Sequence, residues 1–271
     1  MPNTALLRST YRLSWLLAIA ATAAAAGGLL RPELYRDNDF VKTAWLGNDL
    51  ITLFVALPAL LIALVRARHG SLPAQLVLPG LQLYMFYNYA FYLFGAAFNP
   101  FFLLYVAIFA LSAYALMTGL AAVDVEMVQS RFSCKTPVRR ISGYLVFVAL
   151  PLLLVEGGQS LRFLQSGLLP PTVVESGHPT SVVFALDLSV VVPAMLWSAV
   201  LLWKRRAWGF RLGIIMLIMS FFYMLVLLLG TALLATSGPV SHWDPFMPFY
   251  LSVALGSLLC LGVLFFYFKR E

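Results

Sequence analysis

Eight long runs of apolar residues make up most of the chain, and short clusters of charged residues, Pro, Gly and Asn separate them. A run of about 18 or more apolar residues is long enough to cross the hydrocarbon core of a bilayer as a helix. The pattern therefore predicts eight membrane-spanning helices, over residues 12–30, 44–65, 72–97, 99–122, 141–166, 180–203, 208–235 and 245–268. The remaining residues suffice only for short loops, so we expect one membrane domain and no soluble domain.

The composition agrees with this pattern. Hydrophobic residues make up 62% of the chain and charged residues 11%, with a mean hydropathy of +0.90. An ordinary soluble domain is about half apolar and about a quarter charged. The sequence thus excludes a water-soluble fold and predicts an all-α integral membrane protein.

The basic residues predict the orientation of the helices. With the amino terminus in the cytoplasm, fourteen of the 18 Lys and Arg residues fall in cytoplasmic segments, and the others are Arg31, Arg36, Lys42 and Arg162. Cytoplasmic loops of membrane proteins carry such an excess, so we expect both termini in the cytoplasm. The net charge of +7 then requires no nucleic-acid partner, and membrane lipid is the expected one, because basic clusters attract anionic headgroups.

The first apolar run has a second interpretation. Arg8 and Arg12 precede an Ala-rich stretch that resembles a secretory signal with small-residue cleavage sites. Cleavage would leave seven spans and an external amino terminus. We expect the run to be a true span, because it has a counterpart later in the chain.

Three pairs of short segments recur in the same order and predict an internal duplication. The members of each pair are 139, 138 and 145 residues apart, and the pairs begin at Gly28 and Gly167, at Asp49 and Asp187, and at Asn99 and Asp244. They predict two four-helix halves, residues 1–135 and 136–271. Because four spans restore the original orientation, the halves would be parallel repeats. The alternative is that short apolar sequence segments recur by chance.

Three acidic residues, Asp49, Asp187 and Glu156, fall inside predicted spans. An ionised side chain at mid-membrane costs on the order of 3 kcal/mol or more, so such residues are the first functional candidates. Gln159 lies one turn after Glu156 and on the same side. The intervening Gly157-Gly158 would permit a break in the helix that exposes backbone groups to a cavity.

A polar stripe on the third predicted span completes the candidate site. Tyr84, Asn88 and Tyr92 recur every four residues and should face the interior of the bundle. Asn48 extends the polar surface on the second span. Each of these residues could serve only as interhelical hydrogen-bond glue, worth about 0.6 to 2 kcal/mol. Together they predict a polar pocket open to the extracytoplasmic side, built from Asp49, Asp187, Glu156, Asn48, Tyr84, Asn88, Tyr92 and Gln159.

Several chemistries are excluded by missing motifs. No Lys lies inside a predicted span, which excludes a retinal Schiff base. The sequence has no phosphate-binding, zinc-protease or serine-hydrolase motif. Its three His residues are scattered over loops, so we expect no cofactor and no metal centre.

The Asn48-Asp49-Leu50 and Leu186-Asp187-Leu188 helices make the chain similar to bacterial multi-pass membrane proteins that have no assigned activity. This resemblance implies a location in the bacterial inner membrane and carries no functional residues. Three hypotheses follow from the residues. The first is transport or binding of a small molecule or cation, and the duplicated architecture favours it. The others are an enzyme acting on a lipid or isoprenoid, and a non-catalytic assembly subunit.

Overall fold

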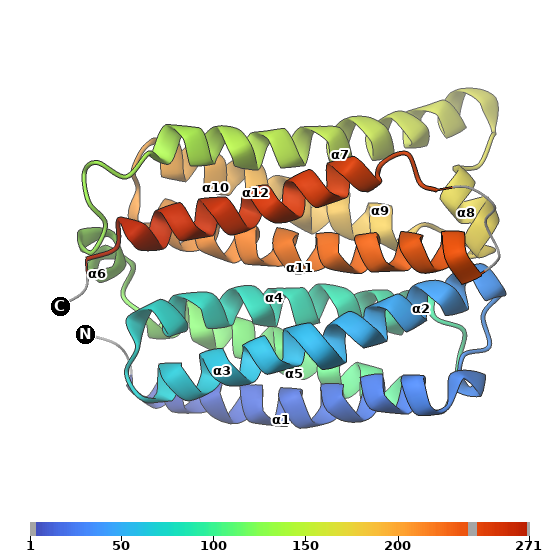
Figure 1. The fold of residues 1–271 in the computed structure, drawn as a ribbon, viewed down its shortest axis with the longest axis horizontal. Coiled ribbons are helices and arrows are strands. Elements are labelled where there is room, and N and C mark those ends of the chain that lie inside the picture. The colour runs from blue at the N-terminus through green and yellow to red at the C-terminus, as the bar shows by residue number, and fades with distance from the viewer. Residues whose placement is uncertain (1–3, 238–242, 270–271) are drawn as a thin grey trace.

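A computed structural model describes residues 4–237 and 243–269, which fold into helices joined by short connections (Figure 1). The first elements are α1 (Thr4–Leu30), η1 (Pro32–Leu34), α2 (Asp39–Ile51), η2 (Thr52–Ala56), α3 (Leu57–Arg68), α4 (Leu72–Gly95), α5 (Phe102–Ala122) and α6 (Val125–Ser130). The later ones are α7 (Val138–Ser166), α8 (Pro171–Ser176), α9 (Val182–Leu186), η3 (Asp187–Val191), α10 (Val192–Trp203), α11 (Ala207–Ser237) and α12 (Met247–Phe266). The described residues contain no β-strand, and the predicted all-α class is confirmed.

Seven helices are long and apolar enough to cross a membrane: α1, α5, α7, α11, α12 and the continuous helices Asp39–Arg68 and Val182–Trp203. This indicates a multi-pass membrane protein. The third predicted span corresponds to α4, a helix of 24 residues that is not among the seven. Its Gln, Asn and Tyr side chains make it less apolar, and most of its residues are buried against other helices.

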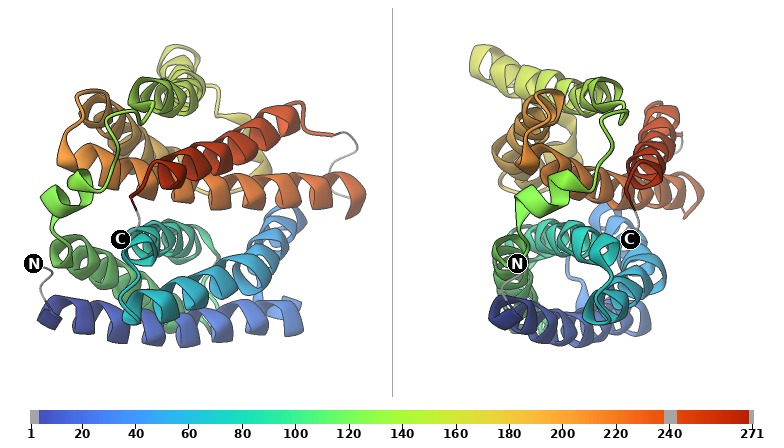
Figure 2. Two further views of the ribbon diagram at one scale, coloured as in Figure 1. Left: turned by 60° about the vertical axis from the view of Figure 1, so that its left-hand side comes forward. Right: turned by 90° about the vertical axis from the view of Figure 1, so that its left-hand side faces the viewer.

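The helices form two groups, α1–α5 and α7–α12 (Figure 1). The first group closes into a ring when viewed along the helices (Figure 2, right). Helix α11 joins the groups by packing against α2 and α4. Helix α1 begins and α12 ends on the left of Figure 1, and we call this side the terminal end of the bundle and the other side the opposite end.

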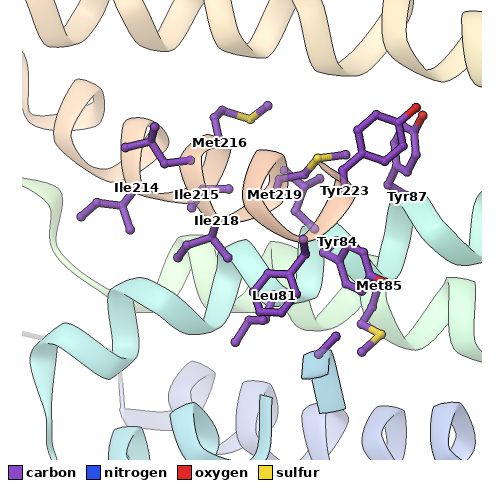
Figure 3. Close-up of a cluster of buried hydrophobic side chains, with 14 of the residues drawn as sticks. Leu81, Tyr84, Met85, Tyr87, Ile214, Ile215, Met216, Ile218, Met219 and Tyr223 are labelled. Atoms are coloured by element: carbon purple, nitrogen blue, oxygen red, sulfur yellow. The ribbon is translucent and has the colours of Figure 1, made fainter. Parts of the chain in front are cut away.

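Helices α4 and α11 interdigitate through apolar side chains that include Leu81 and Met85 from one helix and Ile218 and Met219 from the other (Figure 3). Small residues bring the backbones close. A Cβ added at Gly47 of α2 would lie 3.0 Å from the Cα atom of Gly230 in α11. Close backbone approach at small residues is the usual way in which membrane helices pack.

Two π-helical segments, η2 and η3, interrupt the helices Asp39–Arg68 and Val182–Trp203 at matching places. Each is followed by a proline, Pro58 or Pro193, in the first turn of the next α-helix. Proline cannot donate the helical hydrogen bond and its ring crowds the preceding turn, and a wider turn accommodates that ring. At Pro58 and Pro193 the chain therefore accommodates proline with a π turn.

Arg211, near the start of α11, is fully buried. Its guanidinium donates hydrogen bonds to the carbonyl oxygens of Val123 (2.7 Å) and Gly119 (2.6 Å), at the last turn of α5. The last carbonyls of a helix lack intrahelical donors and carry its negative dipole end. Arg211 therefore caps α5 and ties it to α11.

Arg211→Met should lower the stability of the protein by about 2–4 kcal/mol, because it leaves the α5 carbonyls buried without donors. Thermal unfolding in detergent measures the effect. The matched control is Arg206→Met, since Arg206 is exposed at the same end of the bundle. Equal melting temperatures for the two variants would show that the cap contributes no stability.

Candidate functional site

The predicted polar residues separate into two clusters and a linking set. The Asp49 cluster comprises Tyr35, Trp45, Asp49, Tyr92 and Tyr105. The Asp187 cluster comprises Tyr87, Glu156, Asp187 and Tyr223, and Gln159 lies one turn after Glu156 in α7. The two differ in whether their carboxylate oxygens have hydrogen-bond donors.

Both oxygens of Asp49 have donors. The Tyr35 hydroxyl donates to Oδ2 at 2.5 Å and the Tyr92 hydroxyl to Oδ1 at 2.9 Å. Tyr35 lies in the connection before α2, where burial, and then the charge of Asp49, raises its pKa well above the usual range. The Tyr35 hydroxyl therefore keeps its proton and remains a donor to Asp49.

An aromatic shell closes around Asp49. The Trp45 ring stacks on Tyr92 with 4.3 Å between centroids, and Tyr105 packs 5.2 Å from Tyr92. A Cβ added at Gly28 of α1 would lie 2.1 Å from Asp49 Oδ2, so no space remains on that side. This cluster has the character of a hydrogen-bonded packing core.

The linking set joins α2, η2 and α4. The Thr52 Oγ1 atom lies 3.2 Å from the Tyr84 hydroxyl and accepts a hydrogen bond from Asn88 Nδ2, also at 3.2 Å. Asn48 donates to the carbonyl oxygen of Ala44 in its own helix. All of these side chains are buried, so the predicted polar stripe faces the interior as expected and finds partners there.

The Asp187 cluster is short of donors. Asp187 and Glu156 are 0% and 5% exposed, and their carboxyl groups lie within hydrogen-bonding reach of each other. The Tyr223 hydroxyl donates a long bond of 3.4 Å to Asp187 Oδ2. The other Asp187 oxygen, Oε2 of Glu156 and Oε1 of Gln159 are buried without a hydrogen-bond partner.

Two tyrosines from different helix groups border these acids. Tyr87 of α4 and Tyr223 of α11 pack edge to face with 4.9 Å between ring centroids. Figure 3 shows them side by side with their hydroxyls pointing in the same direction. The Tyr87 hydroxyl faces Asp187 and Tyr223 but makes no well-formed hydrogen bond. The acid pair therefore lies where the two groups meet.

No basic side chain balances the pair. Within residues 4–237 and 243–269, no Lys, Arg or His forms an ion pair with Asp187 or Glu156, and no group of three or more His, Cys, Asp and Glu side chains could hold a metal ion. Two carboxylates in contact repel each other when both are ionised. The pair is therefore doubly ionised only when it binds a cation, and otherwise at least one carboxyl group keeps a proton.

The predicted break at Gly157-Gly158 is wrong, because α7 continues as an α-helix from Val138 to Ser166. Each glycine lowers helix stability by only about 1 kcal/mol relative to Ala, whereas an open backbone in an apolar environment leaves unsatisfied groups that cost more. The irregular backbone near the acids is η3, which begins at Asp187 itself.

The structure gives a different register from the predicted pairing of Asp49 with Asp187. The two π segments and their prolines match at a separation of 135 residues. In this alignment the residue equivalent to Asp187 is Thr52. The same separation relates Asn88 to Tyr223. Asn88 donates to Thr52, and Tyr223 donates to Asp187. The first group thus has a neutral pair where the second has an acid.

The sequence pattern does not indicate Tyr35, Tyr223 or Asp37, because it points only to acids and polar stripes inside predicted spans. Tyr35 and Asp37 lie in a connection, and Tyr223 is a single polar residue in an apolar run. Asp37 accepts hydrogen bonds from Trp45 Nε1 and the backbone N–H of Ala97, and lies 3.6 Å from His178 Nε2. It connects the two groups at the opposite end.

Two described surface hollows lie at the terminal end. One is bordered by α7 and α12, and the other by α6, α10 and α11. Neither includes a predicted site residue, and a pocket open at the opposite end stays a prediction.

Comparison of the chain with protein-family models, curated proteins and solved structures finds no match. Inferences about its function therefore rest on the geometry of the Asp187 cluster.

Proposed function

We propose that this protein binds a small monovalent cation at the Asp187–Glu156 pair in exchange for a proton, and carries it across the membrane. The observation that carries the proposal is the unbalanced acid pair, with one oxygen of each carboxylate buried and unpartnered. A site rich in acceptors and poor in donors suits a ligand that is positively charged. A single charge suits it best, because a monovalent cation that replaces the shared proton leaves the net charge of the site unchanged.

The position of the pair supports transport over binding alone. Asp187 contacts side chains of α4, α7 and α11, so elements of both helix groups meet at one site. Ligand sites of duplicated transporters lie between the repeats, near mid-membrane, where irregular helices meet. The η3 segment supplies such an irregular helix at Asp187.

We further propose that α4 is an eighth span and that residues 1–135 and 136–271 are parallel repeats. Each group is built from four long helices in sequence, α1, α2–α3, α4 and α5 in the first group and α7, α9–α10, α11 and α12 in the second (Figure 1). Asn99 and Asp244 support the repeat, since each accepts a hydrogen bond from the backbone N–H two residues later, at 2.9 and 2.8 Å. The excess of basic residues at the terminal end supports a cytoplasmic position for both termini, in the bacterial inner membrane that the sequence resemblance implies.

The test is cation-dependent proton movement in liposomes containing the purified protein and a trapped pH dye. Gradients of Na⁺, K⁺, choline and tetraethylammonium are applied in turn. We expect at least one of these cations to drive proton flux that protein-free liposomes do not show. Absence of flux with every cation would contradict the proposal.

A further inference from the structure

The two helix groups differ in how closely the first helix of each group packs against the last. The pairs compared are α1 with α5 and α7 with α12. In the first group, Thr10 of α1 donates a hydrogen bond to Thr118 of α5 at 3.0 Å, near the terminal end. In the second group, α7 and α12 lie apart (Figure 2, right). The Tyr144 hydroxyl of α7 forms hydrogen bonds with the Val253 carbonyl oxygen and the Ser257 hydroxyl of α12. Between this contact and the terminal end of the bundle, α7 and α12 border a surface hollow.

The apolar wall of the hollow is one face of α12. It is formed by Leu255, Leu258, Leu259, Gly262, Val263 and Phe266. From the first to the last of these residues the helix rises about 16 Å, which matches half of a hydrocarbon core about 30 Å thick. A Cβ added at Gly262 would meet no atom within 4 Å, so the middle of the wall is open. These dimensions suit a single acyl chain of one leaflet.

The end of the hollow nearest the terminal end is basic and polar. Arg140, in the first turn of α7, and Tyr267, just after α12, both border it. Arg140 is exposed, and no described acid forms an ion pair with it. The neighbouring Arg139 is engaged differently, with its guanidinium 5.6 Å from the Trp203 ring centre. Arginine and tyrosine at the depth of the headgroups suit a phosphate.

We propose that this hollow binds one anionic phospholipid, with an acyl chain along the open face of α12 and the phosphate at Arg140. The charge at the end of the hollow favours a lipid over a second copy of the chain, since a copy in the same orientation would place its own basic terminal end beside Arg140. The hollow is distinct from the Asp187 cluster, and the proposal is independent of cation exchange.

Native mass spectrometry of the delipidated full-length protein in detergent tests the proposal, with phosphatidylglycerol and phosphatidylcholine as probes. We expect phosphatidylglycerol to bind about tenfold more tightly, because both lipids offer a phosphate to Arg140 but the choline cation of phosphatidylcholine offsets this attraction. Arg140→Gln should remove this preference, and Gly262→Leu should weaken the binding of both lipids by filling the hollow. The matched control is Arg66→Gln, at an exposed arginine of the terminal end outside the hollow.

Three results would overturn the proposal: equal binding of the two lipids to the unmodified protein, the same loss in Arg66→Gln as in Arg140→Gln, or unchanged binding in Gly262→Leu. A dimer mass that persists without lipid and is lost in Gly262→Leu would assign the hollow to a second copy instead. Circular dichroism and size-exclusion elution verify that each variant is folded. If Gly262→Leu fails to fold, Gly262→Ala, which adds one methyl group to open space, replaces it.

Discussion

Asp187→Asn and Glu156→Gln are each expected to reduce cation-driven proton flux at least about a hundredfold while the protein remains folded. An amide carries no exchangeable acidic proton and no negative charge, so the pair loses the groups that attract a cation. The amide also offers N–H donors to oxygens that are now unpartnered. Removal of a poorly balanced buried charge is often neutral or stabilising, so the melting temperature should stay the same or rise.

The controls for this prediction are Glu126→Gln and Asp39→Asn, which remove exposed acids outside the cluster. Both should keep the flux of the unmodified protein. If the cluster variants had both a lower flux and a lower melting temperature, the acids would serve in interhelical hydrogen bonding and not as a cation-binding site. If Asp187→Asn and Glu156→Gln both kept the flux of the unmodified protein, the acid pair would take no part in transport.

Gly28→Ala is expected to cause a large loss of stability, about 3 kcal/mol or more, from overpacking and two broken hydrogen bonds. The new Cβ would lie 2.1 Å from Asp49 Oδ2 and 2.3 Å from the Tyr35 hydroxyl. The carboxylate must turn away from its donors, or α1 must move from α2. Thermal unfolding in detergent measures the loss.

The matched control is Gly143→Ala in α7, where an added Cβ meets no atom within 4 Å. This variant should be unchanged or slightly more stable, since Ala favours helix. If the two alanine variants melted at the same temperature, the Asp49 cluster would not be a closed packing core. At temperatures where Gly28→Ala is folded, its proton flux should equal that of the unmodified protein, because Asp49 lies outside the proposed site.

The fold class could be predicted because helix length and apolar composition are local properties of the chain. The all-α class is confirmed, and seven of the expected spans correspond to helices that are long and apolar enough to cross a membrane. Helix boundaries were less accurate, and α2 begins at Asp39, earlier than the expected 44, because Asn38 accepts a hydrogen bond from the Val41 N–H and caps the helix. The π turns could not be predicted from the prolines alone, because Pro79 and Pro151 lie inside continuous α-helices.

The acids of the candidate site could be predicted, but their different environments could not. Asp49 and Asp187 have similar apolar neighbours in sequence, and both are buried. They differ in their donors, which come from distant segments: Tyr35 and Tyr92 satisfy Asp49, whereas Asp187 has a long bond from Tyr223, the Tyr87 hydroxyl facing it without a well-formed bond, and the contact with Glu156. Such partners depend on tertiary packing, which helix periodicity does not predict.

Infrared difference spectroscopy of the detergent-solubilised protein tests proton exchange at the Asp187–Glu156 pair most directly. The measured signal is the carbonyl stretch of a protonated carboxylic acid, recorded before and after addition of the cation that drives flux in liposomes. The cation should remove this band in the unmodified protein, and the double variant Asp187→Asn, Glu156→Gln should show no change. A band that persists in the unmodified protein after the cation is added, or that disappears equally in the double variant, would contradict exchange at this pair.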